Sequence, residues 1–208
     1  MRTLDSLATS VAAKIRFVLS DIDDTITTQG RLTAAAYLAL ERLTAAGITV
    51  IPITGRPAGW CDHIARMWPV YGVVGENGAF YYRYDHLAHK MLGHYWASPD
   101  HLASSRKQLD ALAGSILQAV PGCALASDQA YRQADLAIDF CEDVEPLPEA
   151  DVRRIVALFE AAGAHAKVSS IHVNGWFGDY DKLSMTRTLF AREFDMRLED
   201  HLDEILFI

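Results

Sequence analysis

The sequence has few cysteines, no excess of basic residues and no long apolar run, and each shortage excludes a class of protein. Three scattered cysteines, Cys61, Cys123 and Cys141, suit neither a disulfide framework nor a Cys-x-x-Cys metal site. A formal net charge of −8 offers no basic face to the phosphates of a nucleic acid. No run approaches the roughly 18 apolar residues of a membrane span, and the N-terminus lacks the pattern of a signal peptide. We therefore expect a cytoplasmic protein without nucleic-acid or membrane partners, and leave its oligomeric state open.

About half of the 208 residues are hydrophobic, which is enough for a sizeable core. Continuous apolar runs at 15–20 and 48–54 predict parallel strands covered on both faces. A helix is expected between them at 33–47, where Thr33 caps its start and Gly47 its end. A short helix and a third strand at 71–80 follow. The alternation predicts an α/β, Rossmann-like, doubly wound parallel sheet.

The pattern changes near residue 80, where paired strands, a long helix and a strand of period two follow one another. We expect an inserted α+β cap domain over 80–178. The core domain then comprises 1–79 and 179–208, and its last strand lies in "DEILFI" at 203–208.

Three carboxylates follow the first strand within four positions: Asp21, Asp23 and Asp24. On an extended backbone, positions 21 and 23 point to one side and 24 points away. Two carboxylates this close repel each other unless a cation lies between them. Mg²⁺ prefers such oxygen ligands and is often held by carboxylates together with substrate phosphates.

The ends of the next two strands supply further polar groups, Thr54 and the turn from Gly75 to Gly78. Ligands of open α/β sheets bind beyond the carboxyl ends of the strands, so we expect these groups to meet the acidic cluster there.

The motifs "DIDDT" after a strand, "TGR" ending the next, and Lys182 after the insertion resemble those of the haloacid dehalogenase superfamily. The spacing and the "GENGA" turn are similar to the Cof-like branch with a type IIB cap. That branch includes sucrose phosphatase, mannosyl-3-phosphoglycerate phosphatase and phosphomannomutase. The resemblance covers residues 15–208.

The resemblance implies that Asp21 attacks phosphorus, forms an aspartyl phosphate and binds Mg²⁺. It implies that Asp23 gives its backbone carbonyl to the metal and its side chain as the acid and base. Thr54 would bind a phosphoryl oxygen, and Lys182 would neutralise charge on Asp21 and on the transferring group.

Five further residues are candidates for substrate binding, and four of them have a structural alternative. Arg56 could instead cap a helix or form a surface ion pair, and Asn77 could be a turn residue. His172 and Asn174 alternate on a strand and share one face, which could face the substrate or simply be polar. The full set is Gly55, Arg56, Asn77, His172 and Asn174.

The chain departs from the family at its end, because the fourth motif, whose acids complete the Mg²⁺ site, would follow the strand that ends at Ile208. Asp179 and Asp181 flank Lys182, but nothing in their spacing shows that they replace those acids. We expect the natural protein to continue past Ile208. A gene that stops there would indicate a degenerate member.

These features favour a Mg²⁺-dependent phosphomonoesterase that acts on a small phosphorylated metabolite, most simply a sugar phosphate. The cap would close over the site and read the leaving group. Two alternatives stay open. A phosphomutase would return the phosphoryl group to sugar, and a non-catalytic binding protein would keep the fold without the metal site.

Overall fold

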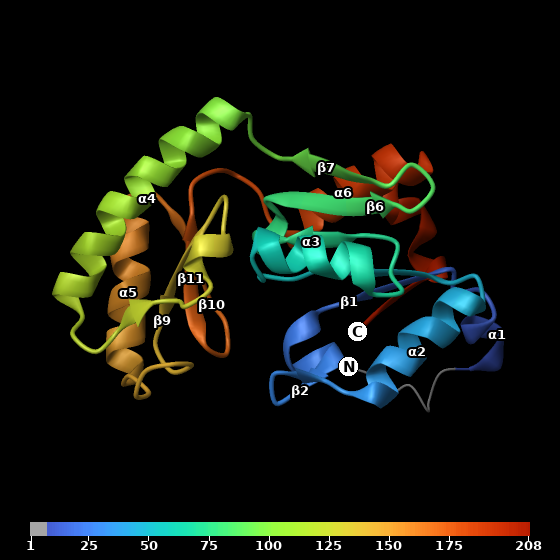
Figure 1. Ribbon diagram of the computed structural model, residues 1–208, viewed down its shortest axis with the longest axis horizontal. Coiled ribbons are helices and arrows are strands. Elements are labelled where there is room, and N and C mark those ends of the chain that lie inside the picture. Colours follow the sequence, from blue (N-terminus) through green and yellow to red (C-terminus); the bar gives the residue numbers. More distant parts are fainter. Residues whose placement is uncertain (1–7) are drawn as a thin grey trace. The chain divides into compact units, whose positions relative to one another are not determined.

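The structure, a computed structural model that describes residues 8–208, consists of two units (Figure 1). The first unit contains the chain up to Arg56, Cys61–His94 and Asp181–Ile208. The second contains Pro57–Trp60 and Tyr95–Tyr180.

A parallel sheet lies at the centre of the first unit. Its middle strand, β1 (Phe17–Ser20), pairs with β4 (Thr49–Pro52) on one side and β12 (Ile205–Phe207) on the other. A parallel bridge between Ile53 and Val74 continues the sheet to β5 (Val73–Gly75). The predicted α/β fold with a parallel sheet is confirmed.

Both faces of β1 are buried, which explains its continuous apolar sequence. Phe17 and Leu19 pack in a cluster with Met185, Leu189 and Phe190 of helix α6 (Lys182–Phe194). The alternating residue Val18 joins a second cluster with Leu40 of helix α2 (Ala34–Ala45). Helix α3 (Ala58–Met67) follows β4 in the chain.

A hairpin of β6 (Phe80–Asp85) and β7 (Lys90–Tyr95) extends from β5. Val73 of β5 pairs with Tyr82 of β6 in antiparallel register. The hairpin therefore belongs to the first unit, and the start of the inserted domain moves from the predicted residue 80 to Tyr95. The sequence showed two paired strands but not which sheet they join, because the partner strand β5 precedes the change of pattern.

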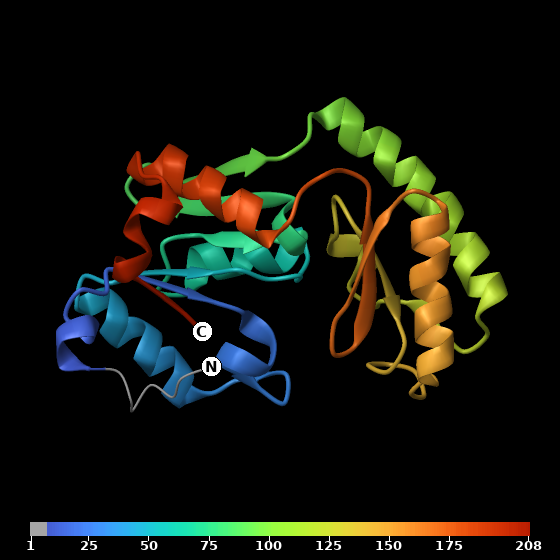
Figure 2. The same ribbon diagram turned by 180° about the vertical axis from the view of Figure 1, so that it is seen from behind.

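The second unit is an antiparallel sheet with two helices on one face (Figure 2). Val173 and Ile138 of the sheet pack with Leu109 and Phe159 of the helices. The elements are α4 (Pro99–Ala119), β8 (Ala124–Leu125), β9 (Leu136–Asp139), α5 (Glu149–Ala161), β10 (His165–Val168) and β11 (His172–Trp176), with strand order β10-β11-β9-β8.

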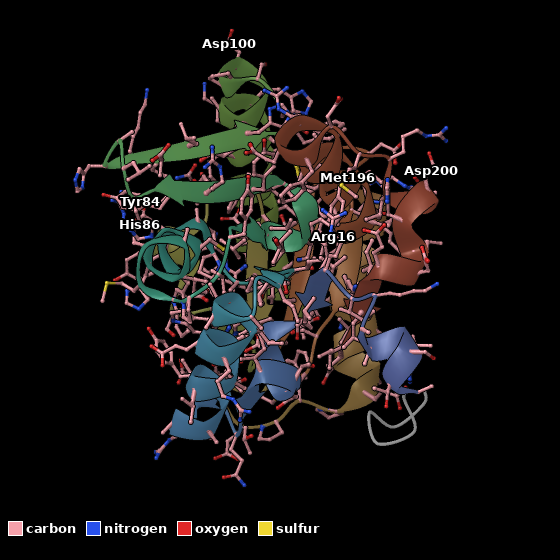
Figure 3. The ribbon with its side chains drawn as sticks, turned by 90° about the vertical axis from the view of Figure 1, so that its right-hand side faces the viewer. Arg16, Tyr84, His86, Asp100, Met196 and Asp200 are labelled. Carbon is pink, nitrogen blue, oxygen red and sulfur yellow. The ribbon has the colours of Figure 1, made fainter. Side chains whose placement is uncertain are left out.

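Smaller elements complete the described chain. Helix α1 (Thr9–Ala12) and the two-residue strands β2 (Thr27–Thr28) and β3 (Arg31–Leu32) were not expected from the sequence. Arg16, labelled in Figure 3, precedes β1 and pairs with Glu204 at 2.9 Å. Short 3-10 turns cover Glu76–Gly78, Gln129–Tyr131 and Leu198–Glu204.

Cys61, Cys123 and Cys141 form no disulfide bond with one another. Within residues 8–208, no helix combines the length and the apolar character that crossing a bilayer requires.

Candidate active site

Asp21 lies directly after β1, and each of its carboxylate oxygens has a partner. Oδ1 accepts a hydrogen bond from the backbone N–H of Ile22 at 2.8 Å. Oδ2 lies 2.6 Å from Nζ of Lys182, which is 161 residues away in the sequence. The Asp21 side chain remains 40% exposed and the Lys182 side chain 24%. A carboxylate and an ammonium group therefore meet at a position that solvent can reach.

The backbone after Asp21 does not continue as a strand. Residues Ile22–Ile26 form a tight turn, closed by a hydrogen bond from Thr27 N–H to the carbonyl of Ile22. Asp24 adopts a left-handed conformation at φ 57°. The expected extended backbone is wrong, so strand alternation cannot place Asp21 and Asp23 on one side. A five-residue turn with a left-handed aspartate has no distinctive sequence signal, since aspartate is common in many turns.

Asp23 forms a two-point ion pair with Arg56. Nε of Arg56 lies 3.1 Å from both carboxylate oxygens, and Nη2 lies 2.7 Å from Oδ1. The Arg56 side chain is 11% exposed and the Asp23 side chain 32%. Arg56 is thus neither a helix cap nor an exposed surface pair, and it contacts the residue expected to act as acid and base.

Thr54 lies beside this pair at the end of β4. The neighbouring Ile53 donates its N–H to the carbonyl of Ser20 at 2.8 Å, so the ends of β1 and β4 are adjacent. Thr54 is fully buried, and its Oγ1 accepts the backbone N–H of Arg56 at 3.0 Å. A hydroxyl that accepts one hydrogen bond still has its own proton to donate. Thr54 therefore retains a hydroxyl proton that it can donate at this edge of the sheet.

The turn Glu76–Gly78 lies between β5 and β6 in the chain. It contacts the residues that follow β4 and the start of α6. Its three residues all have positive φ, at 42°, 56° and 109° in chain order. Glu76 N–H donates to the carbonyl of Arg56, and Asn77 N–H to that of Thr54, both at 3.1 Å. The Asn77 side chain lies against Gly55, where a Cβ would come within 3.2 Å of the amide oxygen.

Gly78 is the point where this turn meets α6. A Cβ at Gly78 would lie 2.1 Å from the carbonyl oxygen of Asp181. Sequence analysis placed the turn from Gly75 to Gly78 at this edge but gave Gly78 no separate role, although a glycine after asparagine is a known turn signal. Its lack of a side chain lets the turn approach the residue that precedes Lys182.

The first turn of α6 holds Lys182 in place. Asp181 caps the helix by accepting the N–H of Ser184 at 2.6 Å, and Ser184 Oγ accepts the N–H of Asp181 at 2.9 Å. The N–H of Ser184 lowers the pKa of Asp181 below its usual range. Asp181 therefore acts as a helix cap that fixes the backbone of Lys182.

His172 and Asn174 belong to the second unit, where both are buried. They share one face of β11, as predicted, because the intervening Val173 packs in the helix-covered core. Asn174 donates to Asp135 at 3.0 Å, and His172 Nε2 lies 2.9 Å from Glu142.

Asp135 also forms an ion pair with the Arg132 guanidinium, which forms a second ion pair with Asp128. Burial, followed by the charge of Arg132, lowers the pKa of His172. These contacts tie both predicted residues into a polar network of their own unit.

The donors near Asp21 allow a partial test of a metal site. In the part of the chain that the structure describes, no three His, Cys, Asp or Glu side chains are grouped to hold a metal ion. Asp21 and Asp23 each pair with a basic side chain instead. Both still present hard oxygen atoms, the donor type that Mg²⁺ takes, so the residues suit one part of a Mg²⁺ coordination shell.

Three solved structures resemble this chain over most of its length. Thermoplasma acidophilum 0175 aligns with a TM-score of 0.67 and 17% identity, over 93% of this chain and 76% of that one. A haloacid dehalogenase-like hydrolase from Bacteroides thetaiotaomicron has a TM-score of 0.62 and 11% identity, over 93% and 80%. A sugar phosphatase of haloacid dehalogenase (HAD) subclass IIB has a TM-score of 0.58 and 13% identity, over 92% of this chain and 79% of that one. No protein-family model matches the chain, and no curated protein matches it in sequence.

These likenesses show the fold of the chain. It has the fold of the haloacid dehalogenase-like phosphatases, including those of subclass IIB. The resemblance indicated by "DIDDT", "TGR" and Lys182 is thus confirmed at the level of fold.

Proposed function

We propose that this chain is a phosphomonoesterase that works through an aspartyl phosphate on Asp21. The observation that carries the proposal is the 2.6 Å contact between Asp21 and Lys182 at the carboxyl end of a buried parallel strand. Ligands of open α/β sheets bind at this edge. Similar structures described as phosphatases of sugars and as related to trehalose-6-phosphate phosphatase support a small sugar phosphate as the substrate class.

The first chemical step forms a bond between a carboxylate oxygen of Asp21 and phosphorus. The bond from phosphorus to the leaving oxygen breaks, and Asp23 supplies the proton that this oxygen needs. Lys182 neutralises charge on Asp21 as the phosphoryl group approaches, and it stabilises the negative charge that develops on the phosphoryl oxygens. The Thr54 hydroxyl donates to one of these oxygens.

The second step releases phosphate. Asp23 takes a proton from a water molecule, whose oxygen attacks phosphorus, and the bond to Asp21 breaks. Asp21 is then a free carboxylate again, and Asp23 carries the proton that the next cycle needs.

Mg²⁺ is the cation that this proposal includes. The Asp21 carboxylate and the Asp23 backbone carbonyl would hold it, together with water and phosphate oxygens. When bound, the ion would neutralise negative charge on the phosphoryl group and would so favour attack by the Asp21 carboxylate.

The test is phosphate release from a panel of sugar phosphates and p-nitrophenyl phosphate, with Mg²⁺ or with EDTA. Asp21→Asn should lower the rate on the order of a thousandfold or more, because asparagine is a poor nucleophile. Asp24→Asn is the matched control, since Asp24 is exposed and asparagine tolerates its left-handed backbone. Wild-type activity, acid-stable phosphate on a peptide containing Asp21, and an active Asp24→Asn protein are expected.

Equal losses in both variants, or no phosphate release by the wild-type chain with Mg²⁺, would refute the proposal. A product that is an isomeric sugar phosphate, with little free phosphate, would instead identify a phosphomutase.

A further inference from the structure

The ion pair between Asp23 and Arg56 holds both oxygens of the proposed acid and base. Three N–H to oxygen contacts of 2.7 to 3.1 Å fix the carboxylate plane relative to the guanidinium. Such two-point pairs restrict orientation far more than a single hydrogen bond does.

The backbone of Arg56 is itself fixed on both sides. Its N–H donates to Thr54 Oγ1 at 3.0 Å, and its carbonyl accepts the N–H of Glu76 at 3.1 Å. The Cys61 thiol also donates to this carbonyl at 3.6 Å. Three residues of the first unit therefore hold the backbone of Arg56, whose side chain extends to Asp23.

Asp23 has less support of its own. It lies in the Ile22–Ile26 turn, outside the sheet, and its side chain is 32% exposed. A side chain in a turn with this exposure samples several rotamers unless a partner restrains it. The restraint on Asp23 comes from Arg56, on the neighbouring strand end.

The two halves of the proposed reaction make different demands on this pair. The acid step passes a proton to the leaving oxygen, and a good leaving group makes this step depend little on where Asp23 points. The base step needs a carboxylate oxygen aimed at water, and the contact of Arg56 with both oxygens of Asp23 fixes that orientation.

We propose that Arg56 is a positioning residue for the second half-reaction, in which Asp23 activates water against the aspartyl phosphate. This inference rests on the proposed function. It differs from the role expected from the sequence, where Arg56 binds substrate, because Arg56 acts here through Asp23.

The experiment separates the formation and the decay of the phosphoenzyme by rapid acid quench, with p-nitrophenyl phosphate and Mg²⁺. This substrate has a good leaving group and depends little on the acid step. Arg56→Met should slow decay about tenfold to a hundredfold, the usual effect of a misplaced catalytic group, and slow formation much less. In the steady state, kcat and KM should fall together while kcat/KM changes little, because phosphoenzyme accumulates.

Two further variants complete the test. Arg56→Lys should recover part of the decay rate, since an ammonium group can pair with one carboxylate oxygen. Arg66→Met is the matched control, because Arg66 makes a similar two-point pair with Asp62 on helix α3. It should form and lose phosphoenzyme at wild-type rates. If Arg56→Met does not fold, as judged by circular dichroism, Arg56→Lys decides the matter through its own decay rate.

A higher KM with unchanged decay would show that Arg56 binds substrate and would overturn the inference. Equal slowing of phosphoenzyme formation and decay would assign Arg56 a general structural role and would also overturn the inference. If the wild-type protein forms no more phosphoenzyme than the Asp21→Asn variant, the proposed function itself is refuted.

Discussion

Replacing Gly78 by alanine should damage the site without touching a catalytic side chain. The backbone at Gly78 has φ 109°, where an L-residue costs about 1 to 2 kcal/mol more than glycine. The new Cβ would also lie 2.1 Å from the oxygen and 2.3 Å from the carbonyl carbon of Asp181. Relieving such overlap typically costs about 1 to 3 kcal/mol. We therefore expect Gly78→Ala to lower the free energy of unfolding by about 2 to 5 kcal/mol.

The assay is urea unfolding, and Gly30→Ala is the matched control. Gly30 has φ 70°, and a Cβ there would meet nothing within 4 Å, so only the backbone cost of about 1 to 2 kcal/mol applies. The difference between the two variants measures the contact with Asp181. Because Lys182 follows Asp181, folded Gly78→Ala protein should also lose about a hundredfold in phosphatase activity. Equal destabilisation by both variants would refute the role assigned to the contact between the turn and α6.

Two predictions concern titrating groups. Burial, followed by the charge of Glu193, raises the pKa of Tyr71 to about 12 from 10.0, so this phenol's contribution to stability is complete below pH 10 and is lost as the pH rises through about 12. Glu193→Gln should shift the alkaline absorbance titration of Tyr71 toward 10, and an unshifted titration would contradict the effect assigned to Glu193. Burial, followed by Arg132, lowers the pKa of His172 from 6.5, so its contribution is complete above pH 6.5 and is lost as the pH falls. His172→Gln should flatten the acid side of a thermal unfolding series, and an unchanged pH dependence would count against a buried neutral ring.

Local signals in the sequence were sufficient for most helices. The helix expected at 33–47 is observed at Ala34–Ala45, with Thr33 as its N-cap and Gly47 at φ 79° beyond its end. Helix α4 at Pro99–Ala119 is the long helix expected within the inserted domain. Caps and periodicity act within a few residues, so the chain itself carries this information.

Strand partners were less accessible. The hairpin of β6 and β7 was expected in the inserted domain, yet it joins β5 in the first unit. Alternation of side chains shows that a strand exists and which of its faces is apolar, but not which strand will lie beside it.

Some residues of the candidate site could be identified from the sequence, whereas their contacts with one another could not. The ends of predicted strands pointed to Asp21 and Thr54, since ligands of open α/β sheets bind beyond the carboxyl ends of the strands. Lys182 was indicated by the resemblance to the haloacid dehalogenase superfamily. The pairing of Asp23 with Arg56 emerged only in three dimensions, because it depends on how the turn at Ile22–Ile26 leaves the sheet. The tertiary structure also decided that Gly78 must lack a side chain, since Asp181 occupies that space from more than a hundred residues away. Sequence determines the chemistry that a position can perform, whereas backbone contacts between distant segments decide which groups act together.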